Sequence, residues 1–173
     1  MEDLKISLLD KKLLGVKKLY NREALFFYII DYNETFYFGV EEFDFKLEGY
    51  QIRLVHDIEE TKIIDNFSSK INEKEGLIEK IKPYKINLES FETIFNDLYK
   101  MDKIISIERE YHDDDNFFLI GKIVSVTFDS IWFKDFSVDG IWNEEISIIP
   151  FELITTVRFD SNYINIWEKY IWD

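Results

Sequence analysis

Two long stretches of this sequence alternate between apolar and polar residues, and this pattern limits the fold more than any other feature. They span residues 13–65 and 103–160, and a charged stretch with helical spacing at 66–101 separates them. A period of two places successive side chains on opposite faces of a β-strand. Tight polar breaks divide both stretches into short strands, which is typical of a small barrel or sandwich. We therefore expect a mainly β chain with accessory helices, in the α+β class.

Five candidate strands can be marked in each stretch. They are 13–20, 24–32, 35–40, 49–55 and 61–65 in the first, and 103–111, 117–128, 130–136, 144–150 and 154–160 in the second. The acidic residues 41–48 are interpreted as a break, and Asp139-Gly140 as a hairpin turn. Alternation predicts that Ile131 and Phe133 face inward while Trp132 faces the opposite side. In the first stretch it likewise predicts Phe36 and Phe38 inside and Tyr37 outside.

Helices are expected in three further places. Residues 68–81 form a candidate helix that ends before Pro83. A second candidate carries Phe91, Ile94, Phe95 and Leu98 on one face, and Asn87 or Ser90 can cap its start. The tail at 161–172 has helical spacing through Tyr163, Ile166, Trp167 and Tyr170, and we expect it to pack on the second unit.

The two strand-rich stretches align as one unit used twice. With a shift of 95 residues, the breaks between strands coincide from residue 29 to residue 65, and four positions are identical. The sequence thus predicts a first barrel at 1–65, a helical linker at 66–86, and a second barrel with flanking helices at 87–173.

The segment GKIVSVTFDSIWFKD, followed by IPFELITTVRF, resembles the Sm-like fold of the LSm and Hfq proteins. The resemblance rests on Gly121, on Asp129 before a bulky strand, and on the short strand, turn and last strand that follow. Sm-like units also carry a helix before the first strand, which 2–9 and 87–100 would supply. The chain is also similar to uncharacterised tandem Sm-like proteins of low-GC Gram-positive bacteria. The resemblance implies two tandem five-stranded Sm-like or SH3-like small barrels.

The chain departs from the RNA-binding members of that family in the turn before the last strand. Those members carry polar and basic residues there, whereas this chain has Pro150-Phe151-Glu152 and, in the first copy, Val55-His56-Asp57. The departure argues against phosphate contact at this turn.

Charge narrows the classes of partner. The chain has 21 Lys and Arg against 35 Asp and Glu, a net charge of −14. This field repels nucleic acid and anionic membranes and attracts a basic protein, although acidic residues can also serve solubility alone. Residues 101–173 hold 6 basic and 15 acidic residues, a net of −9. The leading hypothesis is a non-enzymatic protein, such as an immunity-type inhibitor, that binds a basic protein through an acidic face.

The candidate partner-binding residues of that face are Trp132, Asp135, Asp139, Trp142, Glu144 and Glu145. Large aromatic side chains beside carboxylates suit a basic partner. The other interpretation is that most of the four tryptophans, Trp132, Trp142, Trp167 and Trp172, belong to the core or pack under the C-terminal helix. The alternative hypothesis is a degenerate Sm-like RNA-binding protein that uses Lys11, Lys12, Lys17, Lys18 and Arg22.

A third hypothesis is a divalent-metal enzyme built on the acidic loop at 112–115. Consecutive carboxylates seldom all face one ion, and the EF-hand spacing is absent, so we expect a solvated hairpin loop and no metal site. The chain has no Cys and only two His, and no catalytic motif, so we expect neither an enzyme nor a cofactor. It shows no signal peptide and no apolar run long enough to span a bilayer, which predicts a cytoplasmic protein.

Overall fold

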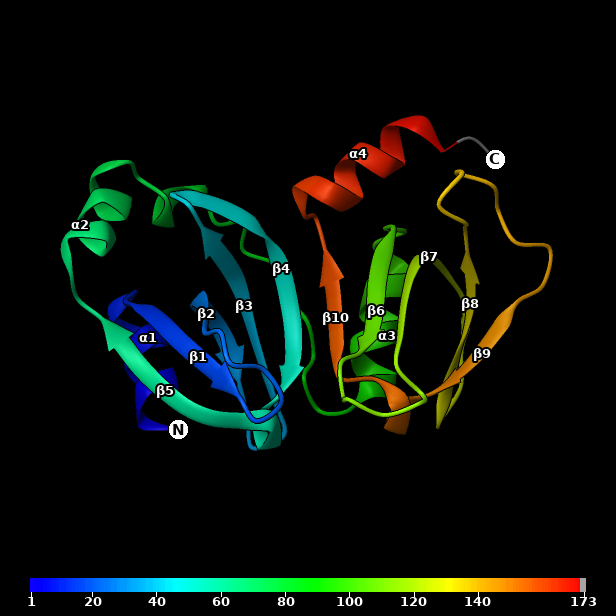
Figure 1. Cartoon of the computed structure of the whole chain (residues 1–173), viewed down its shortest axis with the longest axis horizontal. Coiled ribbons are helices and arrows are strands. Elements are labelled where there is room, and N and C mark those ends of the chain that lie inside the picture. Colours follow the sequence, from blue (N-terminus) through cyan, green and yellow to red (C-terminus); the bar gives the residue numbers. More distant parts are fainter. Residues whose placement is uncertain (172–173) are drawn as a thin grey trace. The chain divides into compact units, whose positions relative to one another are not determined.

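The structure, a computed structural model, describes residues 1–171 of the 173-residue chain (Figure 1). The chain divides into two compact units, Met1–Tyr84 and Lys85–Asp173. Both are mainly β with accessory helices, as the sequence predicts.

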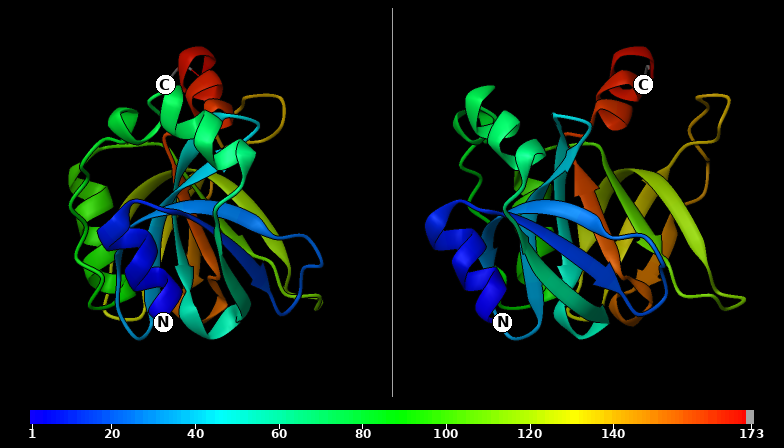
Figure 2. Two further views of the ribbon diagram at one scale, coloured as in Figure 1. Left: turned by 90° about the vertical axis from the view of Figure 1, so that its left-hand side faces the viewer. Right: turned by 60° about the vertical axis from the view of Figure 1, so that its left-hand side comes forward.

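In the first unit, an N-terminal helix precedes five strands. Its elements are α1 (Glu2–Asp10), β1 (Leu13–Lys18), β2 (Leu25–Tyr32), β3 (Phe36–Phe43), β4 (Lys46–Leu54), η1 (Val55–Asp57), β5 (Ile58–Ile64), α2 (Phe67–Lys74) and η2 (Ile78–Lys80). The sheet order is β5-β1-β2-β3-β4, and every pair is antiparallel. The strands bend rather than lie flat, because register shifts interrupt three of the four pairs (Figure 2).

The second unit repeats this order. Its elements are α3 (Phe91–Lys100), β6 (Ile105–Arg109), β7 (Phe117–Val126), β8 (Ser130–Asp135), β9 (Ser147–Pro150), η3 (Phe151–Leu153), β10 (Thr156–Phe159) and α4 (Asn162–Tyr170). The sheet order is β10-β6-β7-β8-β9, also antiparallel. In both units the fifth strand therefore lies beside the first.

Neither sheet is a closed barrel, which corrects the barrel prediction. Closure would require the fourth and fifth strands of a unit to pair, and no such pair occurs among residues 1–171. After the fourth strand of each unit a single 3₁₀ turn, η1 or η3, redirects the chain, so that β5 pairs with β1 and β10 with β6 rather than with the strand that precedes it.

Both faces of β3 are buried, which corrects the prediction for Tyr37. This side chain is only 1% exposed and belongs to the cluster that α1 covers, with its ring edge-on to Phe27 at 5.8 Å between centroids. Phe38, on the adjacent position of the strand, packs instead against Tyr50. Alternation assigns a solvent-facing side only where one face of a sheet stays uncovered.

The predictions for α3 and β8 are confirmed. Ser90 caps α3, because its Oγ accepts the N–H of Thr93 at 3.2 Å in a capping box. The helix lies behind β6 and β7 (Figure 1), with Ile94, Phe95 and Leu98 buried. Ile131 and Phe133 are fully buried, whereas Trp132 is 42% exposed.

The hairpins are confirmed at one position and corrected at another. Gly140, at φ 73°, donates its N–H to Ser137 O at 2.9 Å, which makes the turn predicted at Asp139-Gly140. The break predicted at 41–48 is wrong, since β3 and β4 run through it and leave only Asp44 and Phe45 as the turn. Both have positive φ, 51° and 64°, as in a type I′ turn.

Helix α4 forms as predicted, but of the four residues expected on its packed face only Trp167 packs against the core cluster. Ile164 is 2% exposed and packs with Trp167 against Ile104, Ile120 and Phe136. Tyr163, Ile166 and Tyr170, predicted on the packed face, are exposed. Both faces carry apolar side chains, so spacing alone could not select between them.

Replacing the two isoleucines of α4 separately tests this face. Ile164→Ala is expected to lower the free energy of unfolding by about 2–5 kcal/mol, because it leaves a cavity in the cluster. Ile166→Ala, the matched control, should change it by less than about 0.5 kcal/mol. Urea denaturation measures both, and equal losses would contradict the assigned face.

Gly121 offers a second test of the packing. A Cβ at this position would lie 2.1 Å from Lys134 O and 2.7 Å from Asp135 Cα, both backbone atoms of β8. Gly121→Ala is therefore expected to lower the free energy of unfolding by at least about 2 kcal/mol. Ser125→Ala, at an exposed position of the same strand, is the control. Unchanged stability of Gly121→Ala would refute the close approach of β7 and β8.

Candidate functional site

An exposed apolar group lies on the sheet of the second unit. Trp132 on β8 is the register partner of Ile148 on β9, and Ile148 is 60% exposed. Val124 and Ile146 are exposed as well, and we call these four residues the outer patch. Exposed apolar side chains that cluster on a sheet are characteristic of contact surfaces.

The structure separates the six sequence-predicted partner-binding residues into two sets. Asp139, Glu144 and Glu145 are exposed, as is Trp132. Asp135, in contrast, is buried and accepts a hydrogen bond from Asn143 Nδ2 at 2.7 Å. Trp142 is half-buried, and its ring packs edge-on against Phe136 with 5.3 Å between centroids.

Asp135 is therefore held inside the loop before β9, whereas the half-buried Trp142 lines a surface pocket together with Val124 of the outer patch. Trp167 packs in the core of the second unit, and Trp172 lies outside the described residues.

The sequence-predicted basic residues do not form a free cationic surface. Lys18 is only 2% exposed, with its Nζ 4.9 Å from the centre of the Tyr20 ring. Lys17 forms an ion pair with Glu59 at 2.8 Å, and Lys12 one with Glu73 at 3.3 Å. Lys11 and Arg22 are exposed. Three of the five cations are thus buried or paired with a carboxylate.

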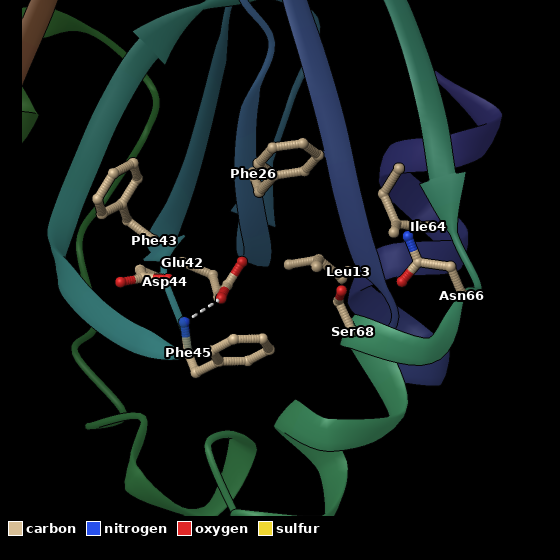
Figure 3. Close-up of a pocket in the computed structure, with 9 residues that line it drawn as sticks. All are labelled: Leu13, Phe26, Glu42, Phe43, Asp44, Phe45, Ile64, Asn66 and Ser68. Atoms are coloured by element: carbon tan, nitrogen blue, oxygen red, sulfur yellow. Dashed lines mark hydrogen bonds between the residues drawn. The ribbon is translucent and has the colours of Figure 1, made fainter.

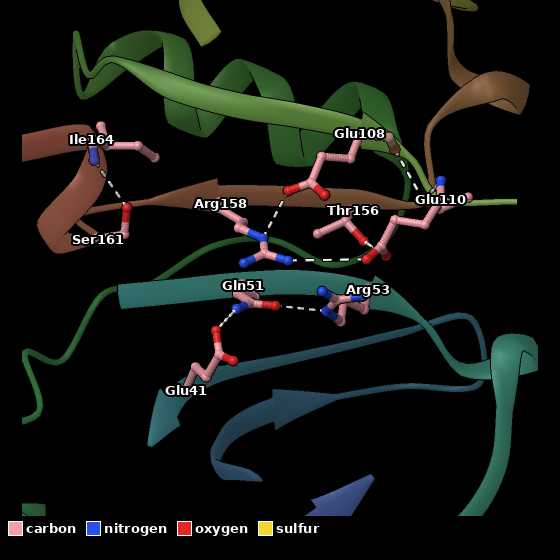
Figure 4. Close-up of polar contacts among 10 residues, drawn as sticks. Glu41, Gln51, Arg53, Glu108, Glu110, Thr156, Arg158, Ser161 and Ile164 are labelled. Atoms are coloured by element: carbon pink, nitrogen blue, oxygen red, sulfur yellow. Dashed lines mark hydrogen bonds and ion pairs between the residues drawn. The ribbon is translucent and has the colours of Figure 1, made fainter. Parts of the chain in front are cut away.

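Other charged side chains are also engaged within their own unit (Figure 4). In the first unit, Arg53 Nε donates to Gln51 Oε1 at 2.6 Å. In the second unit, Arg158 Nε lies 2.8 Å from Glu108 Oε1 in an ion pair, and Thr156 Oγ1 donates to Glu110 Oε2 at 2.6 Å. A count of charges in the sequence therefore overstates the charge available to a partner.

The two histidines have different surroundings. His56 Nε2 lies 3.4 Å from Oδ1 of the buried Asp57, which also accepts from the Tyr20 hydroxyl at 3.5 Å. His112 is exposed in the loop after β6. The sequence placed His56 in a turn beside Asp57, but it could not show that Tyr20, from a distant part of the chain, also contacts Asp57.

In the acidic loop, the first of the three consecutive aspartates is paired with an arginine. Arg109 Nε and Nη2 donate to the two oxygens of Asp113 at 3.1 and 2.5 Å. This hydrogen-bonded pair lowers the pKa of Asp113. Among residues 1–171, no group of three or more His, Asp or Glu side chains is arranged to hold a metal ion.

The first unit contains a cavity of about 330 Å³ that the sequence did not predict (Figure 3). It opens between the β3–β4 turn and the start of α2, and we call it the Phe cavity. Its lining residues are Leu13, Phe26, Glu42, Phe43, Asp44, Phe45, Ile64, Asn66 and Ser68. In Figure 3 the rings of Phe26 and Phe45 lie on either side of the Glu42 carboxylate.

The signal for this cavity was present in residues 41–45 but was interpreted as a break. The letters EEFDF contain no glycine, proline or asparagine that would end β3, and the turn places a phenyl ring where glycine or asparagine is usual. Because this stretch is rich in acidic residues, the sequence pattern did not identify it as part of a strand.

Comparisons with protein-family models, with curated proteins and with solved structures found no match. None of the helices in residues 1–171 is both long and apolar enough to cross a membrane.

The pairing of Arg109 with Asp113 predicts a shift that NMR titration can measure. In the native protein the Asp113 carboxyl should titrate below its ordinary pKa, and Arg109→Gln should raise that pKa. Because the folded pKa is depressed, the stabilisation from this pair exists above the unfolded-state pKa and is lost as pH falls through the folded pKa. Lys122→Gln, which removes a cation 3.7 Å from Asp102, is the control. An unchanged Asp113 pKa in Arg109→Gln would contradict the pairing.

Proposed function

We propose that this chain is a non-enzymatic binding protein that engages a basic protein through the outer patch and the carboxylates beside it. The observation that carries the proposal is the exposed Trp132–Ile148 pair, which lies close in sequence to the exposed Glu144 and Glu145. An exposed aromatic anchor supplies contact area, while neighbouring acids steer and select a cationic partner. An immunity-type inhibitor of a toxic basic protein is one concrete form of this function.

We also propose that the two units are tandem Sm-like repeats with open rather than closed barrels. Three features support this reading: each unit has a helix before its first strand, the same strand order, and a 3₁₀ turn between its fourth and fifth strands. A cytoplasmic location, as expected from the sequence, belongs to the same proposal.

RNA binding through the basic residues of the first unit receives less support. Phosphate contact needs accessible cations, whereas Lys18 is buried and Lys12 and Lys17 are paired with carboxylates. Recovered RNA therefore serves as an opposing outcome in the experiment below.

Affinity capture from an extract of the source organism, with nuclease treatment, tests the proposal. The wild-type chain should retain a basic protein, and Glu144→Lys/Glu145→Lys should lose it because charge reversal repels the partner. Glu23→Lys/Glu34→Lys, which reverses two exposed acids of the first unit, is the control with the same net charge. Once the partner is identified, Trp132→Ala is expected to weaken its binding roughly 30-fold, as for a hot-spot residue.

Two results would contradict the proposal. Equal capture by the two charge-reversed variants would show that net charge rather than this face attracts the protein. Capture of RNA in untreated extract, with no protein left after nuclease, would favour the ancestral Sm-like role.

A further inference from the structure

We propose that the Phe cavity of the first unit binds an alkylated ammonium group, with Glu42 as the counter-charge and phenylalanine rings as the walls. This site is formed entirely by residues 13–68 and does not depend on the partner surface proposed for the second unit.

The position of Glu42 is the first argument. Its side chain is on a strand at the register position opposite Phe26, so the two side chains share one face of the sheet. The residue is 8% exposed, and its Oε1 accepts the N–H of Phe45 at 2.9 Å. Its Oε2 has no hydrogen-bond or ion-pair partner among residues 1–171. A carboxylate in such apolar surroundings is stabilised by a cation that reaches it.

The walls of the cavity are the second argument. The rings of Phe26 and Phe45 line it together with the aliphatic Leu13 and Ile64, whereas the ring of Phe43, which follows Glu42 on the strand, points away (Figure 3). The faces of aromatic rings carry negative potential and attract cations, most strongly where water is displaced. Rings near a carboxylate (Figure 3) are therefore suited to a group that is both positively charged and apolar on its surface.

The turn that supplies Phe45 is the third argument. Phe45 has φ 64°, a backbone conformation that bulky side chains rarely adopt, and it follows Asp44 at φ 51°. The hydrogen bond from its N–H to Glu42 holds the ring and the carboxylate in one arrangement. Residues 41–48 carry four acids and one base, a local net charge of −3, which adds attraction for a cation.

The size of the cavity and the hydration of the cation together indicate which class of ligand fits. A cavity of about 330 Å³ is at the small end of ligand sites and fits a head group rather than a large metabolite. A bare ammonium is strongly hydrated and would lose water on entry, whereas methyl groups on nitrogen reduce this loss and contact the rings. A free choline-like molecule and a methylated lysine side chain both carry this chemistry.

NMR titration of the ¹⁵N-labelled full chain with choline tests the site. The matched probe is the neutral alcohol in which carbon replaces the choline nitrogen, since it has the same shape without the charge. Choline should shift the amide signals of Glu42, Asp44 and Phe45, and the neutral alcohol should bind at least about fivefold more weakly. No shift at the highest soluble choline concentration, or equal binding of both probes, would overturn the proposal without any variant being needed.

Two variants then test the role of the carboxylate. Glu42→Gln retains an acceptor for the Phe45 N–H but removes the charge, so it should weaken choline binding about tenfold, while Glu48→Gln, outside the lining, should not. Unchanged affinity in Glu42→Gln would overturn the role of the carboxylate.

A peptide with trimethyl-lysine distinguishes the two sources of the ligand. Tighter binding than choline indicates a protein ligand, and weaker binding indicates a free amine. If neither probe binds, the proposal fails, whatever the outcome of the partner capture.

Discussion

Pairing of the fifth strand with the first holds each unit together. In the first unit the β1–β5 ladder joins Leu13 to Ile64 and Lys18 to Ile58, residues separated by most of the unit's sheet-forming sequence. Such non-local pairing closes a long loop, whose entropy the burial of the core must offset. The same pairing sets the surfaces of the unit, because Leu13 and Ile64 meet across it and both line the Phe cavity. The Phe cavity is thus a consequence of the β1–β5 strand register and not an addition to the fold.

The sequence predicted a residue's structure correctly where local chemistry determines it. It failed where the burial of a residue depends on which other element packs over it. Ser90 and the apolar stripe of α3 are local signals, and both were predictable. The same is true of the glycine turn at Gly140, where positive φ and residue type agree. Tyr37 and the face of α4 were not predictable, because each depends on what covers a surface. Pattern alone cannot show that α1 covers one face of β3, nor choose between two apolar faces of one helix.

The candidate sites show a similar limit. The sequence identified Trp132, Glu144 and Glu145, which are exposed, but grouped them with Asp135, which the loop before β9 buries against Asn143. It grouped Lys18 with solvent-exposed lysines, although the residue is buried beside Tyr20. A net charge of −14 describes the long-range field, whereas the charge available to a partner is what remains after such internal pairing. The remaining exposed acids, rather than the total, define where a basic partner could bind.

The two units share a strand order but differ at the hairpin between the third and fourth strands. In the alignment shifted by 95 residues, Glu42 corresponds to Ser137 and Phe45 to Gly140, while Asp44 and Asp139 are identical. A Cβ added at Gly140 would lie 3.7 Å from Trp167, so this turn packs near α4 and carries neither the carboxylate nor the ring of the first unit. If the units arose by duplication, their hairpins diverged in chemistry while the pairing of strands was retained. Cation binding in the first unit and an exposed aromatic surface in the second would then be separate functions on one repeated framework.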